Sequence, residues 1–256
     1  MLSYRELLEQ APSVAILPVG CYEQHGPVLP LDTDNLIAQA AAHRLAERLG
    51  NAHVFPLLAY TTTEPNVNFA GTVSVAADPF RAYLREVCRA ILGAPFESLV
   101  VVNSHGSIVG SLKEIGFELV MEQYRRSRDR VRPVLVLNVF DCDRTIEAAL
   151  GEEVGRHADW KEFLLCYGLL GESYFTPERR QRLQQFAKAH AFDDQMPRVL
   201  GIPAELRSTD GVQGRPLPRS TDYARQAEQV WDITVDYLHQ TVVDELDAFT
   251  RLATSR

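Results

Sequence analysis

GCYEQHGPVLPLDTD, residues 20–34, follows an apolar run at residues 14–19 that is typical of a short buried strand. Glycine and proline interrupt the apolar pattern, so we expect Glu23 and His25 to lie where the strand meets a loop. Residues i and i+2 of an extended segment point the same way, and these two side chains can therefore face a common point. Asp34 follows a turn, directly before a helical pattern, and can bring a second carboxylate to that point.

Two carboxylates and one imidazole form an oxygen and nitrogen ligand set that suits zinc, manganese or iron. Each residue also has a simpler explanation. Asp34 could cap a helix that begins near Asn35. His25 could be a hydrogen-bonded loop histidine, and Glu23 could be an exposed carboxylate. Each simpler explanation is more common for a lone residue, but three such residues in one constrained loop bring the two interpretations to roughly equal weight.

The rest of the chain alternates predicted strands and helices. After a short helix at 3–11, in which Ser3 and Glu6 form a capping-box pattern, strands are expected at 13–19, 53–58, 98–103 and 133–140. Helices are expected at 35–49, at 78–92 with Asp78 as its cap, at 109–124 and from about 221 onward, whereas 141–200 is less regular. This alternation predicts an α/β fold with a mainly parallel sheet covered on both faces. No internal repeat or low-complexity linker is visible, which favours a single domain over residues 1–256.

A second polar residue stands at the end of another predicted strand. His105 follows the apolar run of residues 98–103 directly. In open parallel sheets, ligands bind beyond the carboxyl ends of the strands. We therefore expect His105 to lie near Glu23 and His25, because all three follow strand ends.

Composition and charge exclude several classes of protein. Of the 256 residues, 46% are hydrophobic and 23% are charged, and the net charge is −8, as in an ordinary globular protein. The basic cluster at residues 125–130 contains an acid and is typical of a solvated helix end, so we expect no nucleic-acid partner. No run of ~18 apolar residues and no signal-peptide pattern occur, and the four cysteines are scattered. The sequence therefore predicts a cytoplasmic protein without a membrane partner.

The loops after the predicted strands contain motifs that resemble those of the creatininase family of metal-dependent amidohydrolases. Its first motif reads approximately G-x-x-E-Q-H-G-P-H-L-P-L-x-T-D, and residues 20–34 match it nearly throughout. The N-G-H-G-G-N signature is similar to residues 103–108, and the F-P-G-T-I-S loop is similar to residues 69–74. Residues 157–164 resemble the H-A-G-x-x-E-T-S segment, and residues 211–216 resemble the G-V-x-G-D-P loop. The first motif is specific, and the others are short but occur in the family's order.

The resemblance implies a role for eight residues. The implied metal ligands are Glu23, His25, Asp34 and His105, with Asp34 as the carboxylate that bridges two divalent ions and Asp32 as a neighbour that does not bind. The implied catalytic residues, which handle protons or complete the shell of the second ion, are His157 and Glu162. The implied substrate-binding residues are Gly106 and Ser107. The implied cofactor is one or two divalent ions of zinc, manganese or iron.

The resemblance also implies a fold and an assembly. Members of the family have a three-layer α/β/α sandwich around a mostly parallel central sheet, which agrees with the strand and helix pattern. They commonly form homo-oligomers, often hexamers. We therefore expect a homo-oligomer that acts on a small-molecule amide substrate.

Several positions depart from the family pattern. Val28 replaces the second histidine of the first motif, Ser107 stands where creatininase itself has a metal-binding glutamate, and Arg215 replaces an aspartate. The metal-proximal residues are kept while positions that would face the substrate have changed. Cys21, beside the expected ligands, is interpreted as a small packing residue and not as a nucleophile.

The expected activity is hydrolysis of a non-peptidic C–N bond, in an amide, a cyclic amide or a formamide other than creatinine. Two alternatives remain open. One is a peptidase-like member that trims a modified peptide, and the other is a non-catalytic relative that only binds metal. Metal content and sensitivity to chelators distinguish an enzyme from a decayed member.

Overall fold

A parallel sheet lies at the centre of the computed structural model, which describes residues 3–128, 130–186, 203–208 and 210–254. Its strands are β1 (Val14–Val19), β2 (Ala52–Val54), β3 (Ser98–Asn103) and β4 (Val134–Asn138), in the order β2-β1-β3-β4. β1 pairs with β3 along its whole length, from Val14 opposite Ser98 to Val19 opposite Asn103. The two central strands therefore end side by side, and the loops that follow them begin at the same level.

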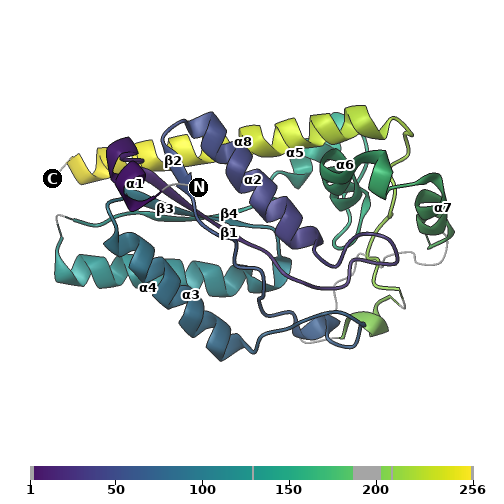
Figure 1. Cartoon of the computed structure of the whole chain (residues 1–256), viewed down its shortest axis with the longest axis horizontal. Coiled ribbons are helices and arrows are strands. Elements are labelled where there is room, and N and C mark those ends of the chain that lie inside the picture. Colours follow the sequence, from purple (N-terminus) through teal and green to yellow (C-terminus); the bar gives the residue numbers. More distant parts are fainter. Residues whose placement is uncertain (1–2, 129, 187–202, 209, 255–256) are drawn as a thin grey trace.

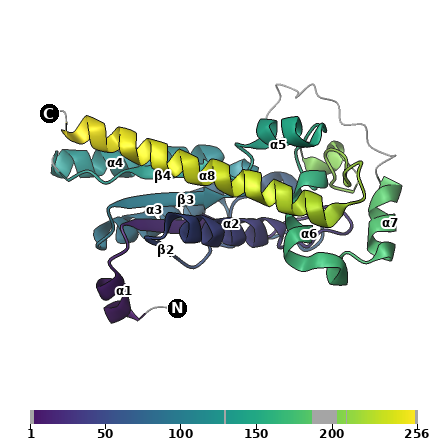
Figure 2. The same cartoon turned by 90° about the horizontal axis from the view of Figure 1, so that it is seen from above.

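Helices connect the strands and cover both faces of the sheet. They are α1 (Tyr4–Gln10), α2 (Thr33–Leu49), α3 (Ala77–Gly93), α4 (Val109–Arg126), α5 (Asp143–Leu150), α6 (Trp160–Tyr174), α7 (Pro177–Phe186) and α8 (Tyr223–Thr254). Three one-turn helices, η1 (Glu64–Asn66), η2 (Gly106–Ile108) and η3 (Ala204–Leu206), lie in the loops. Figure 1 shows α3 and α4 on one side of the sheet and α2 and α8 on the other, and Figure 2 shows α8 running along the length of the molecule.

Alternate residues of the strands enter two separate cores. Leu17 of β1 and Val101 of β3 pack with the apolar residues of α3 and α4. Ile16 and Val100, one position earlier in each strand, point to the opposite face and pack with α2, α6 and α8. Since both faces are buried, β1 and β3 carry almost no polar residues before their ends. The expected three-layer α/β/α sandwich with a parallel sheet is confirmed.

Most predicted elements are present, and the errors are at their boundaries. The capping box of Ser3 and Glu6 opens α1 as expected. The strand predicted at 53–58 is only three residues long, because Pro56 cannot donate a hydrogen bond, although Phe55 and Leu58 still donate to β1 carbonyls. Asp78 is not a cap, since α3 begins at Ala77 and no side chain caps it.

The C-terminal half is more helical than the sequence suggested. Residues 141–200 contain α5, α6 and α7, and residues 187–200 lie outside the described part. The last helix is a single element of 32 residues. No helix in the described residues combines the length and the apolar character needed to span a membrane. The single domain over residues 1–256 stays a prediction.

A close approach between α6 and α8 depends on Gly168. A Cβ at this position would lie 2.8 Å from the indole ring of Trp231. The ring has little room to move, because it is 1% exposed and its Nε1 donates to the carbonyl of Leu165 at 3.0 Å. The guanidinium of Arg44 lies on the ring, 4.3 Å from its centre.

We expect Gly168→Ala to lower the free energy of unfolding by about 1–2 kcal/mol, because overpacking against Trp231 outweighs the helix propensity gained with alanine. Gly116→Ala in α4 is the matched control, since a Cβ there would lie 3.5 Å from the side chain of Val134, an ordinary contact. The control should raise the free energy of unfolding by up to about 1 kcal/mol. Denaturant unfolding of the three proteins checks both values, and equal stabilisation by the two substitutions would contradict the packing argument.

Candidate metal centre

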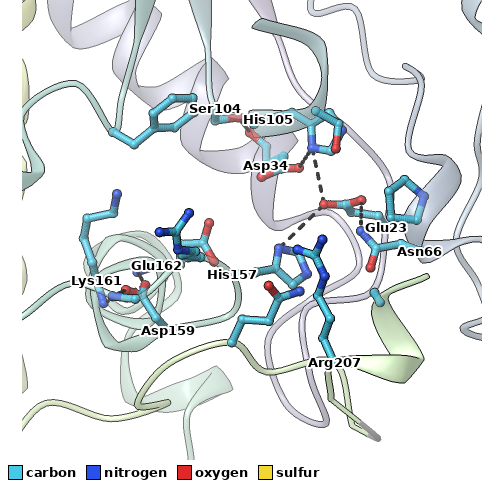
Figure 3. Close-up of a pocket in the computed structure, with 18 of the residues that line it drawn as sticks. Glu23, Asp34, Asn66, Ser104, His105, His157, Asp159, Lys161, Glu162 and Arg207 are labelled. Atoms are coloured by element: carbon cyan, nitrogen blue, oxygen red, sulfur yellow. Dashed lines mark hydrogen bonds and ion pairs between the residues drawn. The ribbon is translucent and has the colours of Figure 1, made fainter. Parts of the chain in front are cut away.

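The loops after β1 and β3 meet the first turn of α2 at one end of the sheet. Glu23 and His25 come from the loop after β1, and His105 comes from the loop after β3. Asp34 lies in the first turn of α2. All four side chains are buried, with exposures of 3% or less. Figure 3 shows Glu23, Asp34 and His105 pointing toward one another, as the positions at the strand ends predict.

Two close contacts bring Asp34 into this group. A Cβ at Gly20 would lie 2.8 Å from Asn35 Cα, so glycine at the end of β1 allows α2 to begin against it. Ser104, directly after β3, donates its hydroxyl to the carbonyl of Asp34 at 2.6 Å. The helix begins at Thr33, and Asp32 occupies its N-cap position. Asp34 is therefore not the cap of α2.

The Asp34 carboxylate lies between two histidines. Its Oδ1 is 3.4 Å from Nε2 of His25, and its Oδ2 is 3.1 Å from Nδ1 of His105. A second carboxylate completes each side: Oε1 of Glu23 is 3.3 Å from Nδ1 of His105, and Oε2 of Glu162 is 3.9 Å from Nε2 of His25. Two groups of possible ligand atoms thus share one carboxylate.

Three histidine rings are held in the same way, each through a backbone carbonyl. Nδ1 of His25 lies 3.2 Å from the carbonyl of Glu23, and Nε2 of His105 lies 3.0 Å from that of Thr62. Nε2 of His157 lies 2.7 Å from the carbonyl of Gln24. A carbonyl only accepts hydrogen bonds, so in each ring this nitrogen carries the proton. The other nitrogen then has its lone pair directed at the carboxylates in the neutral ring, as in metal-ligating histidines.

Two atoms of this cluster lack a hydrogen-bond partner among the described residues. Nε2 of His25 and Oδ2 of Asp34 are buried and make no hydrogen bond with any described residue. Leaving a buried polar atom unpaired costs about 1–3 kcal/mol. The donor set, with carboxylate oxygens and imidazole nitrogens around these atoms, fits a divalent cation.

The pKa values of the cluster indicate that its carboxylates are stabilised by nearby positive charge. Burial alone would lower the pKa of His25, but the charges of Asp34, Glu162 and Glu23 outweigh burial and raise it to about 10. His105 is also buried, and Glu23 and Asp34 raise its pKa well above the usual value. Burial would raise the pKa of both Glu23 and Asp34, but the facing histidines lower it. Either protons on the imidazoles or bound cations can supply the charge that these carboxylates require.

The second oxygen of Glu23 is held by the loop before and within η1. Oε2 of Glu23 accepts hydrogen bonds from the hydroxyl of Thr63 and from Nδ2 of Asn66, the latter at 2.7 Å. Asn66 Oδ1 in turn accepts from Nε2 of Gln24 at 3.0 Å. Sequence reasoning missed these supporting residues. The polar character of residues 61–70 was the available signal, but nothing in it specified which strand end the loop would contact.

His157 and Glu162 lie at the beginning of α6, beside the cluster. Nδ1 of His157 is 3.7 Å from Oε1 of Glu23, and the centre of its ring lies 4.4 Å from that of His25, with the two rings tilted by 43°. Oε2 of Glu162 accepts from the backbone nitrogen of Ala158 at 2.6 Å. Ala158 has a positive φ of 52°, a strained conformation for a residue other than glycine. This turn brings both predicted catalytic residues next to the four predicted ligands.

A cavity of about 470 Å³ opens over the cluster. Gly106 and Ser107, at the beginning of η2, line it. Its other lining residues, which sequence reasoning missed, include Asn66, Phe140, Asp143, Arg156, Lys161 and Arg207. Lys161 is buried and its ammonium is 2.6 Å from Asp143, so a fixed ion pair borders the cavity.

Two of the departures from the family pattern have a structural explanation. Val28 is buried in the core that includes α6 and α8, so the residue that replaces histidine serves packing. Arg215 pairs with the buried carboxylate of Glu152 at 2.6 Å, and its carbonyl accepts from the backbone nitrogen of Trp160 at the beginning of α6. The guanidinium therefore balances the buried charge of Glu152, and the main chain at this position supports the beginning of α6.

Comparisons with known proteins include partial matches to several hydrolases. The chain is 37% identical over 110 residues to the mycofactocin precursor peptide peptidase of Mycobacterium ulcerans. The aligned segment covers 40% of this chain and 43% of that protein. It is 28% identical over 143 residues to the creatinine amidohydrolase of Pseudomonas putida, which covers 54% of each. The matched segments thus span about half or less of these curated relatives.

The whole fold matches a solved structure named "Creatininase Mn", with a TM-score of 0.76 and 20% sequence identity over 95% of this chain and 96% of that one. At this identity the likeness establishes the shared fold. The profile of the creatininase family, described as creatinine amidohydrolase, matches residues 2–242, which is most of the chain. This protein therefore belongs to the creatininase family.

Proposed function

We propose that this chain is a metal-dependent hydrolase that cleaves a C–N bond. The observation that carries the proposal is the single buried carboxylate of Asp34 between His25 and His105, each with a further carboxylate beside it. We assign Glu23, Asp34 and His105 to one divalent ion and His25, Asp34 and Glu162 to a second. In this assignment Glu162 is a ligand, because its Oε2 faces Nε2 of His25, which has no hydrogen-bond partner among the described residues.

Divalent ions bound at such a site would lower the pKa of a water molecule and polarise the carbonyl of the substrate. The protein must then move a proton from that water to the leaving nitrogen. His157 is the group in position for this transfer, because its Nε2 is fixed on the carbonyl of Gln24 and its Nδ1 faces Glu23. It can accept a proton at Nδ1 and return it to the leaving group there.

The substrate we propose is a small amide, a cyclic amide or a formamide. A cavity of about 470 Å³ accepts a compact molecule, and Gly106 and Ser107 would lie against it. A second candidate is a peptide amide bond, as in a peptidase that trims a modified peptide. The match to the peptidase of Mycobacterium ulcerans, at 37% identity, favours this candidate.

A panel of amides, lactams, formamides and short peptides, assayed with Mn²⁺, Zn²⁺ and Fe²⁺, separates these candidates. Turnover of small amides alone supports the first proposal, and turnover of peptides alone supports the second. A protein that binds one or two ions per chain but hydrolyses no member of the panel would favour a non-catalytic relative. A homo-oligomer in the cytoplasm also remains our expectation, and light scattering of the purified protein measures its assembly.

Two aspartates of one motif test the assignment of the shared carboxylate. Asp34→Asn should remove one or both ions and lower kcat/KM by roughly two orders of magnitude or more, because the shared carboxylate neutralises charge on both sides. Asp32→Asn is the matched control, since Asp32 Oδ1 accepts a hydrogen bond from Asn35 Nδ2 at 2.6 Å and contacts neither histidine. The control should keep near wild-type metal content.

Elemental analysis of both purified variants, with circular dichroism to verify folding, measures the difference. Equal retention of metal in the two folded variants would exclude Asp34 as a ligand.

Creatinine itself should not be a substrate. With Ser107 where creatininase has a metal-binding glutamate, and with Val28 buried instead of a histidine at the site, we expect negligible creatinine hydrolysis by the metal-loaded protein. The measurement is creatine formation at saturating creatinine, with metal content determined in the same sample. Efficient turnover would show that neither position is needed for this substrate.

A further inference from the structure

We propose that Cys21 is a further ligand at this metal centre, on the side of His105, and that its thiolate directs the choice of ion toward zinc. The inference rests on the proposed function, because it concerns the same centre. It replaces the interpretation of Cys21 as a packing residue.

The backbone turns Cys21 toward the centre. Cys21 lies two residues before Glu23 in the segment that continues β1, and the two side chains are both buried. Tyr22 between them points away: it is half-buried, and its ring lies 6.2 Å from that of Tyr60. Alternate residues of an extended segment share a side, so the thiol and the Glu23 carboxylate face the same space.

The distances are suited to a common ion. The sulfur of Cys21, a carboxylate oxygen of Asp34 and a ring nitrogen of His105 all lie within 4.8 Å of one another. The same Asp34 has a buried oxygen, Oδ2, without a hydrogen-bond partner among the described residues, and that oxygen is directed at His105. An unpaired carboxylate oxygen beside an imidazole nitrogen and a thiol forms a mixed set of the kind that zinc accepts.

The other thiols of the chain have different surroundings. Cys142 and Cys166 donate to Val139 O at 3.4 Å and Thr33 Oγ1 at 3.8 Å, respectively. Cys88 is buried among the apolar residues of α3 and its neighbours. Of the four cysteines, only Cys21 is grouped with two predicted ligands, the carboxylate of Asp34 and the imidazole of His105.

A thiolate ligand changes which ion the centre prefers. Sulfur is a soft ligand that favours zinc, whereas carboxylates alone suit manganese. Replacing Cys21 with serine keeps the size of the side chain and removes the sulfur. The loss of affinity should therefore be larger for Zn²⁺ than for Mn²⁺.

Cobalt substitution tests the proposal directly, because a sulfur ligand to Co²⁺ produces a charge-transfer absorption band in the near ultraviolet. We expect the Co²⁺-loaded wild-type protein to show this band, Cys21→Ser to bind cobalt without it, and Cys166→Ser to retain it. Cys166 is the matched control, because it is also buried and lies against Thr33 of α2, close to the centre. Competition between Zn²⁺ and Mn²⁺ for the apoprotein gives the shift in preference.

The outcomes separate this inference from the proposed function. A wild-type protein that binds cobalt without the band, or a Cys21→Ser variant that retains it, would overturn the assignment of Cys21 and leave the metal centre intact. A folded protein that binds no divalent ion would overturn the proposed function itself.

Discussion

The pairing of β1 with β3 in full register determines where the chemistry of this protein can occur. Because Val19 lies opposite Asn103, the two loops that follow begin at one level and next to each other. Parallel strands buried on both faces carry their polar side chains mainly at or beyond their ends, and here Glu23, His25 and His105 all lie beyond them. The sheet therefore both excludes these groups from the core and concentrates them in one place.

The sequence predicted the part of the cluster that depends on local order along the chain. Residues that directly follow apolar runs could be assigned to strand ends, and this argument found Glu23, His25 and His105. It could not find Thr63 and Asn66, which support Glu23 from about 40 positions away, because long-range contacts leave no periodic signal. The first turn of α2 was misjudged for a related reason, since its position depends on the close approach of Asn35 to Gly20 and on the hydrogen bond from Ser104 to the carbonyl of Asp34.

The likeness to relatives with different named substrates agrees with the division of the site into two parts. Most of the cluster of carboxylates and histidines lies at the ends of β1 and β3 and in the first turn of α2, whereas much of the cavity wall comes from α6 and the loops around η2 and η3. A family can keep the first part and vary the second, because fold and function are set by different residues. The ion pair of Lys161 with Asp143 belongs to the walls, and so do Arg156 and Arg207.

The backbone carbonyls that hold the three imidazoles have an evolutionary consequence. Glu23, Gln24 and Thr62 contribute main-chain oxygens, which a change of side chain cannot delete. The tautomer of each ring is therefore robust to point mutation as long as the loops keep their path. Mutational drift in the surrounding side chains can alter what enters the cavity without altering which nitrogen faces the centre. Single substitutions in the cavity walls can therefore change which substrate is preferred while the imidazole rings keep their orientation.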